Sequence, residues 1–190
     1  MTQWELTEER EGFKLNGEIV CRLEEMLPCR LYIDWTGWKR IYKYIDIMRK
    51  DQMMTIVVLD GQGGGIGRAL VAAILPVLPK GTELLCVGTN AMATAAMLKA
   101  GAQRGATGEN AVRWAAEHAD VLVAPIALVL KDSMMGEVTG VMASSVGASR
   151  AVRILVPTER CGTHVAGIGA MSMQQLIEDA ARQAAAACIR

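Results

Sequence analysis

After residue 53 the chain alternates short apolar runs with longer segments whose apolar residues recur every three or four positions. The apolar runs have the length and the Val, Ile and Leu content of strands buried on both faces of a sheet. They cover residues 55–60, 83–88, 120–126 and 151–156. The amphipathic segments predict helices at 66–78, 91–100, 109–119, 134–148 and 173–188, with Pro76 in the first and three glycines in the fourth as local conflicts.

Strands that alternate with helices in this way predict an α/β fold that is Rossmann-like. The sheet is expected to be open and mostly parallel, with helices on both faces. In such sheets, ligands bind outside the carboxyl ends of the strands. The segments that follow the four predicted strands are therefore the places where functional residues are expected.

The first 52 residues differ in composition from the rest. Seven of the eight Phe, Trp and Tyr side chains precede residue 53, and Trp114 alone follows it. Two halves of one core seldom differ this much, so we expect an N-terminal extension over 1–52 and the Rossmann-like domain over 53–190. Ile19, Leu23 and Met26 recur at helical spacing and favour a helical appendage.

Three interpretations of the extension remain open. Residues 31–48 mix aromatic and basic side chains, which is typical of an interfacial or nucleic-acid-binding arm. The same pattern fits a helix docked on the main domain with its cations in water. Alternatively, codons for residues 49–52 can spell a ribosome-binding tract just before Met53 and Met54, so the extension would be a mis-annotated start.

Composition narrows the function classes. Lys and Arg number 20, and so do Asp and Glu, which argues against binding nucleic acid through bulk positive charge. No apolar run reaches the roughly 18 residues that cross a membrane, and the polar start is not a secretory signal, so a cytoplasmic location is expected. Five scattered cysteines without a CxxC pair, and only two histidines, predict no metal site.

A glycine-rich segment joins the first predicted strand to the first predicted helix. It runs from Asp60 to Gly67 as Asp-Gly-Gln-Gly-Gly-Gly-Ile-Gly. The P-loop pattern fails for lack of a lysine, and GxGxxG fits no register. GxxxGxG fits as Gly61, Gly65 and Gly67, which is the spacing of the short-chain dehydrogenase nucleotide loop.

The physical chemistry of this segment predicts an anion site. Bare backbone lets a phosphate approach the N–H groups, and the helix that follows points its positive end at the same spot. The alternative is a tight turn without a ligand. Asp60 either braces the loop or faces the ligand, and bracing is favoured because an unscreened carboxylate repels phosphate. The expected partner is a small-molecule nucleotide, with NAD or NADP as the cofactor.

Ordinary dehydrogenase chemistry fits less well. An NAD site usually has an acidic residue at the end of the second strand, where this chain has Gly88-Thr89-Asn90. Glu83 lies at the opposite end of that strand. All three tyrosines precede residue 53, and none has the Tyr-x-x-x-Lys spacing of a short-chain dehydrogenase.

At this point the sequence resembles a known family. DGQGGG at 60–65 and GTNAMATAAMLKAGAQRGATGEN from residue 88 are similar to the bacterial domain-of-unknown-function family DUF3842. The family's Pro-Ile-Gly motif is matched by Pro125-Ile126, with Ala127 in the glycine position. The resemblance covers about 53–190 and implies the fold and the bacterial context, but no chemistry.

Several positions after the strands are candidates for contact with a cofactor. Asn90 could contact the ribose or the base of a nucleotide, or it could cap the second helix. The expected contact residues are Gly61, Gln62, Gly63, Gly64, Gly65, Ile66, Gly67, Thr89, Asn90, Pro125 and Ile126.

Two further functions stay open beside nucleotide binding. Cys161 and His164 form a Cys-x-x-His pair after the fourth strand, and such a pair can make a thiolate nucleophile in an enzyme of unknown reaction. The other alternative is a non-catalytic regulatory or structural subunit. Methionines at 134, 135, 142, 171 and 173 favour adaptable packing or a subunit surface, so a homo-oligomer also stays open.

Overall fold

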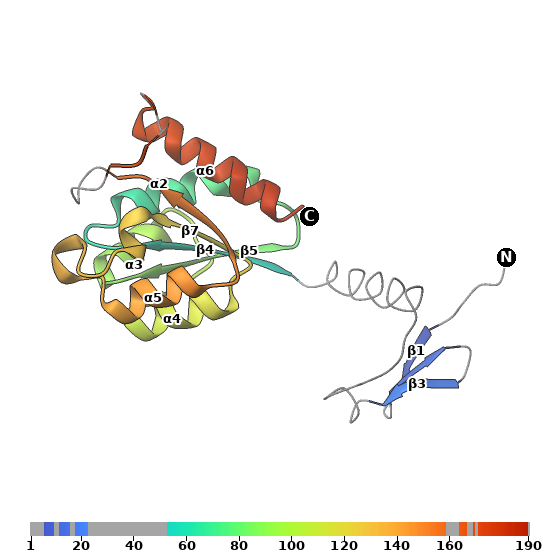
Figure 1. Cartoon of the computed structure of the whole chain (residues 1–190). Coiled ribbons are helices and arrows are strands. Elements are labelled where there is room, and N and C mark those ends of the chain that lie inside the picture. The colour runs from blue at the N-terminus through green and yellow to red at the C-terminus, as the bar shows by residue number, and fades with distance from the viewer. Residues whose placement is uncertain are drawn as a thin grey trace. The chain divides into compact units, whose positions relative to one another are not determined.

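The structure is a computed structural model of the chain, and Figure 1 shows its elements. It describes residues 6–9, 12–15, 18–22, 53–158, 164–166, 169 and 171–189. The chain divides into two compact units, residues 1–51 and 52–190.

The described part of the first unit is a small antiparallel sheet. Its strands are β1 (Leu6–Glu9), β2 (Gly12–Leu15) and β3 (Glu18–Arg22), in the order β1-β2-β3. The helix predicted through Ile19 is therefore wrong at that residue, which lies in β3; Leu23 and Met26 lie outside the described residues. The helical spacing competed with a stronger signal, because an Asn-Gly pair at 16–17 between apolar runs is typical of a β-hairpin. The segment 31–48 also lies outside the described residues.

The second unit contains a five-stranded sheet in which all neighbours are parallel. Its strands are β4 (Met54–Asp60), β5 (Thr82–Gly88), β6 (Arg104–Thr107), β7 (Val121–Pro125) and β8 (Val152–Val156). The spatial order is β6-β5-β4-β7-β8. The chain thus builds outward from β4 in one direction, then crosses to its other side, and this reversal makes the switch point at which such sheets bind ligands. The predicted Rossmann-like α/β fold is confirmed.

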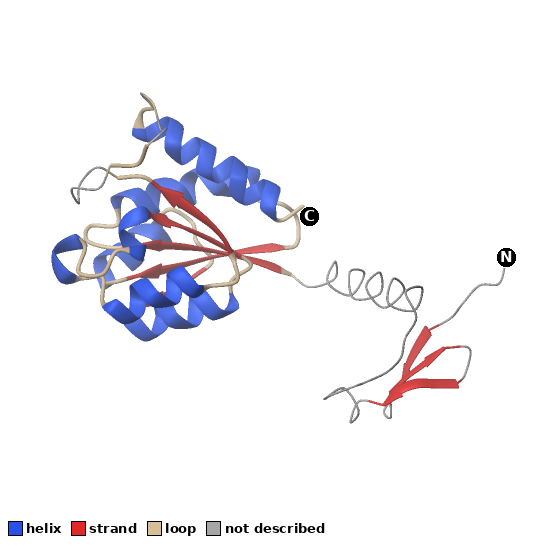
Figure 2. Cartoon of the chain, in the orientation of Figure 1, coloured by secondary structure: helices blue, strands red, loops and turns tan. Residues whose placement is uncertain are grey.

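Helices cover both faces of this sheet, as Figure 2 shows. One face carries α2 (Gly65–Ile74), α3 (Ala91–Lys99) and α6 (Met173–Ala187), and the other carries α4 (Glu109–His118) and α5 (Gly140–Ala148). β4 serves both cores, since Ile56 and Val58 face the first layer whereas Val57 and Leu59 face the second. A strand buried on both faces reads as a continuous apolar run, which is the pattern of its sequence.

Three details differ from the sequence-based expectation. α2 ends at Ile74, and Pro76 lies in a short 3-10 helix, η2 (Leu75–Val77), because proline cannot continue an α-helix. The predicted helix 134–148 is divided into the 3-10 turn η4 (Met134–Gly136) and α5. Strand β6 was not predicted, because it has four residues, all exposed at the sheet edge, and lacks the apolar signature of a buried strand.

A further 3-10 turn, η3 (Ile126–Val129), follows β7 directly. None of the helices in the described ranges combines the length and the apolar character that a membrane span requires.

Candidate functional site

The glycine loop, Thr89 and Asn90 lie together where the two central strands β4 and β5 end, and Pro125 and Ile126 lie at the same edge of the sheet without bonding to them. The glycine loop follows β4, and Thr89 and Asn90 follow its neighbour β5. The two ends are joined directly, since the N–H of Thr89 donates to the carbonyl oxygen of Asp60 over 2.9 Å. Pro125 closes β7 on the other side of β4, and Ile126 begins η3 at the same edge.

Asp60 braces the glycine loop from inside. Its side chain is 3% exposed, and its two oxygens accept hydrogen bonds from the N–H groups of Gly61 over 2.8 Å and Gly67 over 2.6 Å. Burial raises the pKa of Asp60 above its ordinary value, although these backbone hydrogen bonds oppose the change. The prediction that Asp60 braces the loop is confirmed.

Three glycines of the loop are required by internal packing. A Cβ at Gly61 would lie 2.8 Å from Thr89 Oγ1 and 2.5 Å from Met134 Sδ, and a Cβ at Gly67 would lie 2.6 Å from the Cβ of Asp60. Gly64 has a left-handed φ of 67°, and a Cβ there would lie 2.7 Å from the Cα of Ala93. The absence of a side chain at these positions therefore has a structural explanation.

Gly63 and Gly65 have no such explanation. Both are exposed, neither has a left-handed φ, and a Cβ built on either would meet no atom within 4 Å. Within the described residues, their N–H groups have no recorded hydrogen-bond partner. Bare backbone with free donors is thus presented outward at the start of α2.

A carboxylate that the sequence did not mark lies beside this loop. Glu137 Oε2 accepts three hydrogen bonds: from the N–H of Gln62 over 2.8 Å, from Thr89 Oγ1 over 2.6 Å and from Asn90 Nδ2 over 3.0 Å. Partial burial works to raise the pKa of Glu137, but these hydrogen bonds outweigh it and hold the pKa below the ordinary value. The group is therefore a fixed, ionised carboxylate at the end of β5.

Asn90 has two structural tasks at this place. Its Oδ1 accepts from the N–H of Ala93 over 2.9 Å and so caps α3, as one of the two interpretations of this residue predicted. Its Nδ2 donates to the carbonyl oxygen of Gln62 over 2.8 Å as well as to Glu137. Asn90 thereby ties the glycine loop to the first turn of α3.

Glu137 reaches this position through an unusual stretch of backbone. Asp132, Met134 and Met135 all have left-handed φ angles, of 62°, 55° and 62°, although none is glycine. Hydrogen bonds close the stretch, including one from the N–H of Asp132 to the carbonyl oxygen of Val138 over 2.8 Å. Gly136 indicates a turn in the sequence, but no spacing rule connects a residue after the third predicted strand with the end of the second.

The remaining predicted residues stay apart from this cluster. No hydrogen bond joins Pro125 or Ile126 to the cluster in the part of the chain that the structure describes. His164 is exposed beyond β8, and Cys161 lies outside the described residues. Over the described ranges, no group of three or more His, Cys, Asp and Glu side chains could hold a metal ion.

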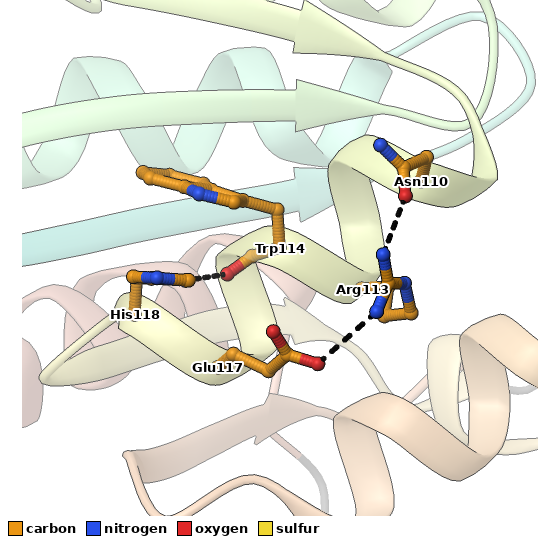
Figure 3. Close-up of polar contacts among 5 residues, drawn as sticks. All are labelled: Asn110, Arg113, Trp114, Glu117 and His118. Carbon is orange, nitrogen blue, oxygen red and sulfur yellow. Dashed lines mark hydrogen bonds and ion pairs between the residues drawn. The ribbon is translucent and has the colours of Figure 1, made fainter.

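The other histidine belongs to the exposed side of α4. His118 stacks on Trp114 with ring centroids 4.5 Å apart, and its Nδ1 lies 2.8 Å from the Trp114 carbonyl oxygen (Figure 3). It ends the helix that leads into β7, so it lies toward the amino edge of the sheet, away from the glycine loop. Cys86 is buried within β5, and burial raises its pKa to about 11, so it is a poor nucleophile.

An open groove of about 740 Å³ runs between α2 and α3 and begins at the glycine loop. Gly63 lines one part of it, and the cations Arg68 and Lys99 line others. Most of its remaining lining is alanine. The groove that begins at Gly63 therefore carries positive charge on its walls.

The model of the family described as domain of unknown function (DUF3842) matches residues 55–188. The match begins in β4 and ends just after α6, so it contains all five strands of the parallel sheet and the helices on both faces. A search of the curated proteins finds no match. The chain is a member of the DUF3842 family.

Proposed function

We propose that this protein binds a nucleotide by its phosphate groups at Gly63–Gly65, with NAD or NADP as the expected class. The observation that carries the proposal is the open backbone of Gly63 and Gly65. Glycine loses more conformational freedom on folding than any other residue, so two glycines that no neighbour requires need another explanation. Close approach of a ligand to the backbone supplies one.

Apart from Glu137, whose carboxylate accepts from the N–H of Gln62, the charges around the loop suit a phosphate. The N–H of Gly65 is among the orphan donors at the start of α2, where the helix dipole favours negative charge. Asp60 lies at the same end, but it is buried and satisfied by two backbone N–H groups, so it does not face the outside. Arg68, in the first turns of α2, provides a full positive charge in the adjoining groove.

The position in the sheet supports a dinucleotide. The loop lies at the switch point between β4 and β7, where the crevice of an open α/β sheet forms. A ligand anchored at Gly63–Gly65 could extend toward Thr89 and Asn90 on one side of β4. On the other side it would pass Pro125 and Ile126. We propose no catalytic role for His164, which is exposed beyond β8.

Calorimetry with NAD, NADP, ATP and ADP tests this function. Gly63→Val and Gly65→Val place a side chain where the phosphate must approach, and we expect each to weaken binding about tenfold or more, the effect of losing about one good interaction. Gly147→Val is the matched control, because Gly147 is also exposed, has no left-handed φ and has open space for a Cβ.

The control variant should bind as the wild type does, and all three variants should keep the thermal unfolding temperature. Unchanged affinity in folded Gly63→Val and Gly65→Val, or no nucleotide binding by the wild type, would contradict the proposal.

A further inference from the structure

Glu137 lies where the ends of two neighbouring strands meet. Gln62, which follows β4, and Thr89, which follows β5, both donate to Glu137 Oε2. The carboxylate is thus bonded to the residue that precedes Gly63, and it lies at the end of β5, the second strand of the parallel sheet along the chain. The strand brings no acidic residue of its own to that place, since β5 ends at Gly88 and is followed by Thr89 and Asn90.

The hydrogen bonds divide the two oxygens of this carboxylate into a held oxygen and a free one. Oε2 accepts all three contacts, and Oε1 has no recorded partner in the described residues. A carboxylate offers about four lone-pair sites, so Oε1 retains its capacity to accept from a ligand. The side chain is half-buried, which leaves a path for that ligand.

The backbone around Glu137 is held in a costly conformation. Left-handed φ angles at Asp132, Met134 and Met135 are unfavourable for residues with a Cβ. Met135 gains no burial in return, because it is 96% exposed. Strain of this kind persists where the surrounding structure imposes it and is common at functional sites. Here the strained segment places the Glu137 carboxylate at the ends of β4 and β5.

The chemistry of a fixed, ionised carboxylate restricts what it can recognise. It accepts hydrogen bonds from hydroxyl groups, and a pair of neighbouring hydroxyls on a ribose suits it. It repels a phosphate at the same distance. Resting on the proposed function, we infer that Glu137 selects the sugar of the bound nucleotide: its Oε1 accepts from the 2′- and 3′-hydroxyls of an unmodified ribose and disfavours a 2′-phosphate, so that NAD binds better than NADP.

A second interpretation of the same contacts predicts the opposite effect on nucleotide affinity when the charge of Glu137 is removed. If the three donors form the phosphate site itself, Glu137 would be an internal anion that competes with the ligand. Removing its charge would then strengthen the binding of every nucleotide. Selection of the ribose predicts instead that removing the charge weakens NAD binding and spares or improves NADP binding.

Calorimetric titration of the full chain with NAD and NADP separates these outcomes. Glu137→Gln keeps an oxygen that can accept from Gln62, Thr89 and Asn90, so the loop should stay in place while the charge is lost. Glu137→Ala removes the whole group. Glu117→Gln is the control, because it removes an exposed carboxylate on α4 that pairs with Arg113.

We expect the wild type and the control to prefer NAD by about tenfold or more, and Glu137→Gln to lose most of that preference. Glu137→Ala should weaken NAD binding further. An unchanged preference in folded Glu137→Gln, or tighter NAD binding by either variant, would overturn the role of Glu137 while leaving nucleotide binding intact. A wild type that binds neither nucleotide would overturn the proposed function itself and this inference with it.

Discussion

The hydroxyl of Thr89 donates to Glu137 Oε2 over 2.6 Å, although the two residues are 48 positions apart in the chain. Thr89 follows β5, whereas Glu137 lies between β7 and α5. Because Gln62 and Asn90 bind the same oxygen, the segments after three different strands meet at one atom. A change in any of them should therefore affect the others.

We predict that Asp60 and Glu137 respond to acid in opposite directions. The pKa of Asp60 is raised in the folded protein, so its contribution to stability is present below the unfolded value of about 3.9 and is lost as pH rises through the folded pKa. The pKa of Glu137 is lowered, so its contribution is present above about 4.3 and is lost as pH falls through the folded pKa.

Urea unfolding of the wild type, Asp60→Asn and Glu137→Gln from about pH 7 down to about pH 3 measures this difference. On acidification, the free energy of unfolding of the wild type should rise relative to that of Asp60→Asn. Relative to Glu137→Gln it should fall. Parallel pH profiles for the three proteins would contradict the environments described for both carboxylates.

The loop glycines should separate into two classes by stability. Gly64→Ala forces a residue with a Cβ into a left-handed conformation, and that Cβ would lie 2.7 Å from Ala93 Cα, so we expect a loss of at least about 2 kcal/mol. In Gly67→Ala, helix propensity favours the change by about 1 kcal/mol, but overlap with the Asp60 Cβ costs about 1–3 kcal/mol and decides the sign. Gly65→Ala should stay within about 0.5 kcal/mol of the wild type. Chemical denaturation measures all three, and a strongly destabilised Gly65→Ala would argue against open space at that position.

The Oδ1 and Nδ2 atoms of Asn90 should make separable contributions to the free energy of unfolding. Asn90→Ala removes the α3 cap and both Nδ2 hydrogen bonds, and we expect a loss of about 1–3 kcal/mol in unfolding free energy. Asn90→Ser keeps a capping oxygen but not the Nδ2 donors, so it should recover the part due to the cap. Equal losses in the two variants would assign the whole effect to the contacts with Gln62 and Glu137.

We predict that residues 1–52 contribute little to the stability of 53–190. All five strands of the parallel sheet and the helices that cover it lie within the second unit. Removing an integral core element would cost several kcal/mol, comparable to the stability of a whole domain. A chain that begins at Met53 should therefore stay folded, with an unfolding temperature within a few degrees of that of the full chain, about the effect of 1 kcal/mol. Insolubility or a much lower unfolding temperature would place the first 52 residues in the core.

Common alcohols and hydroxy acids should not be turned over with NAD or NADP. Hydride transfer needs a group that moves a proton beside the cofactor. His118 is stacked on Trp114 toward the opposite edge of the sheet, and all three tyrosines precede residue 53. Absorbance of the reduced nicotinamide across a substrate panel, with His164→Ala as the comparison, provides the measurement. Robust turnover that this variant loses would make the protein an enzyme.

The sequence predicted the parts of the fold that depend on local pattern. β4 was recognisable because burial on both faces demands an unbroken apolar run, and α6 because one face is apolar and the other charged. β6 was not, since an exposed edge strand of four residues needs no apolar side chains. Pro76 conflicted with the predicted helix 66–78, and in the structure α2 ends at Ile74, two residues before this proline.

Part of the candidate site could be predicted from the sequence, and part could not. Gly63, Gly65, Thr89 and Asn90 follow strands directly, so the topology of a parallel sheet places them at one edge. Glu137 depends instead on three left-handed residues that are not glycine, and no composition rule identifies such a stretch in advance. The sequence could also not show which loop glycines have open space, because that depends on neighbours distant in the chain, such as Met134 and Ala93.

The central place of β4 also has a consequence during synthesis of the protein. β4 is the first strand of the parallel sheet to be made, yet it needs a partner on each side. β5 follows soon, but β7 comes much later. Asp120, which directly precedes β7 and accepts from the N–H of Thr55 in β4, is 65 residues beyond Thr55. Until β7 has left the ribosome, one edge of this strand, which is apolar at residues 56–59, stays unpaired, and an unpaired apolar strand edge favours aggregation. Burial of this edge therefore waits until β7 has been made and pairs with β4.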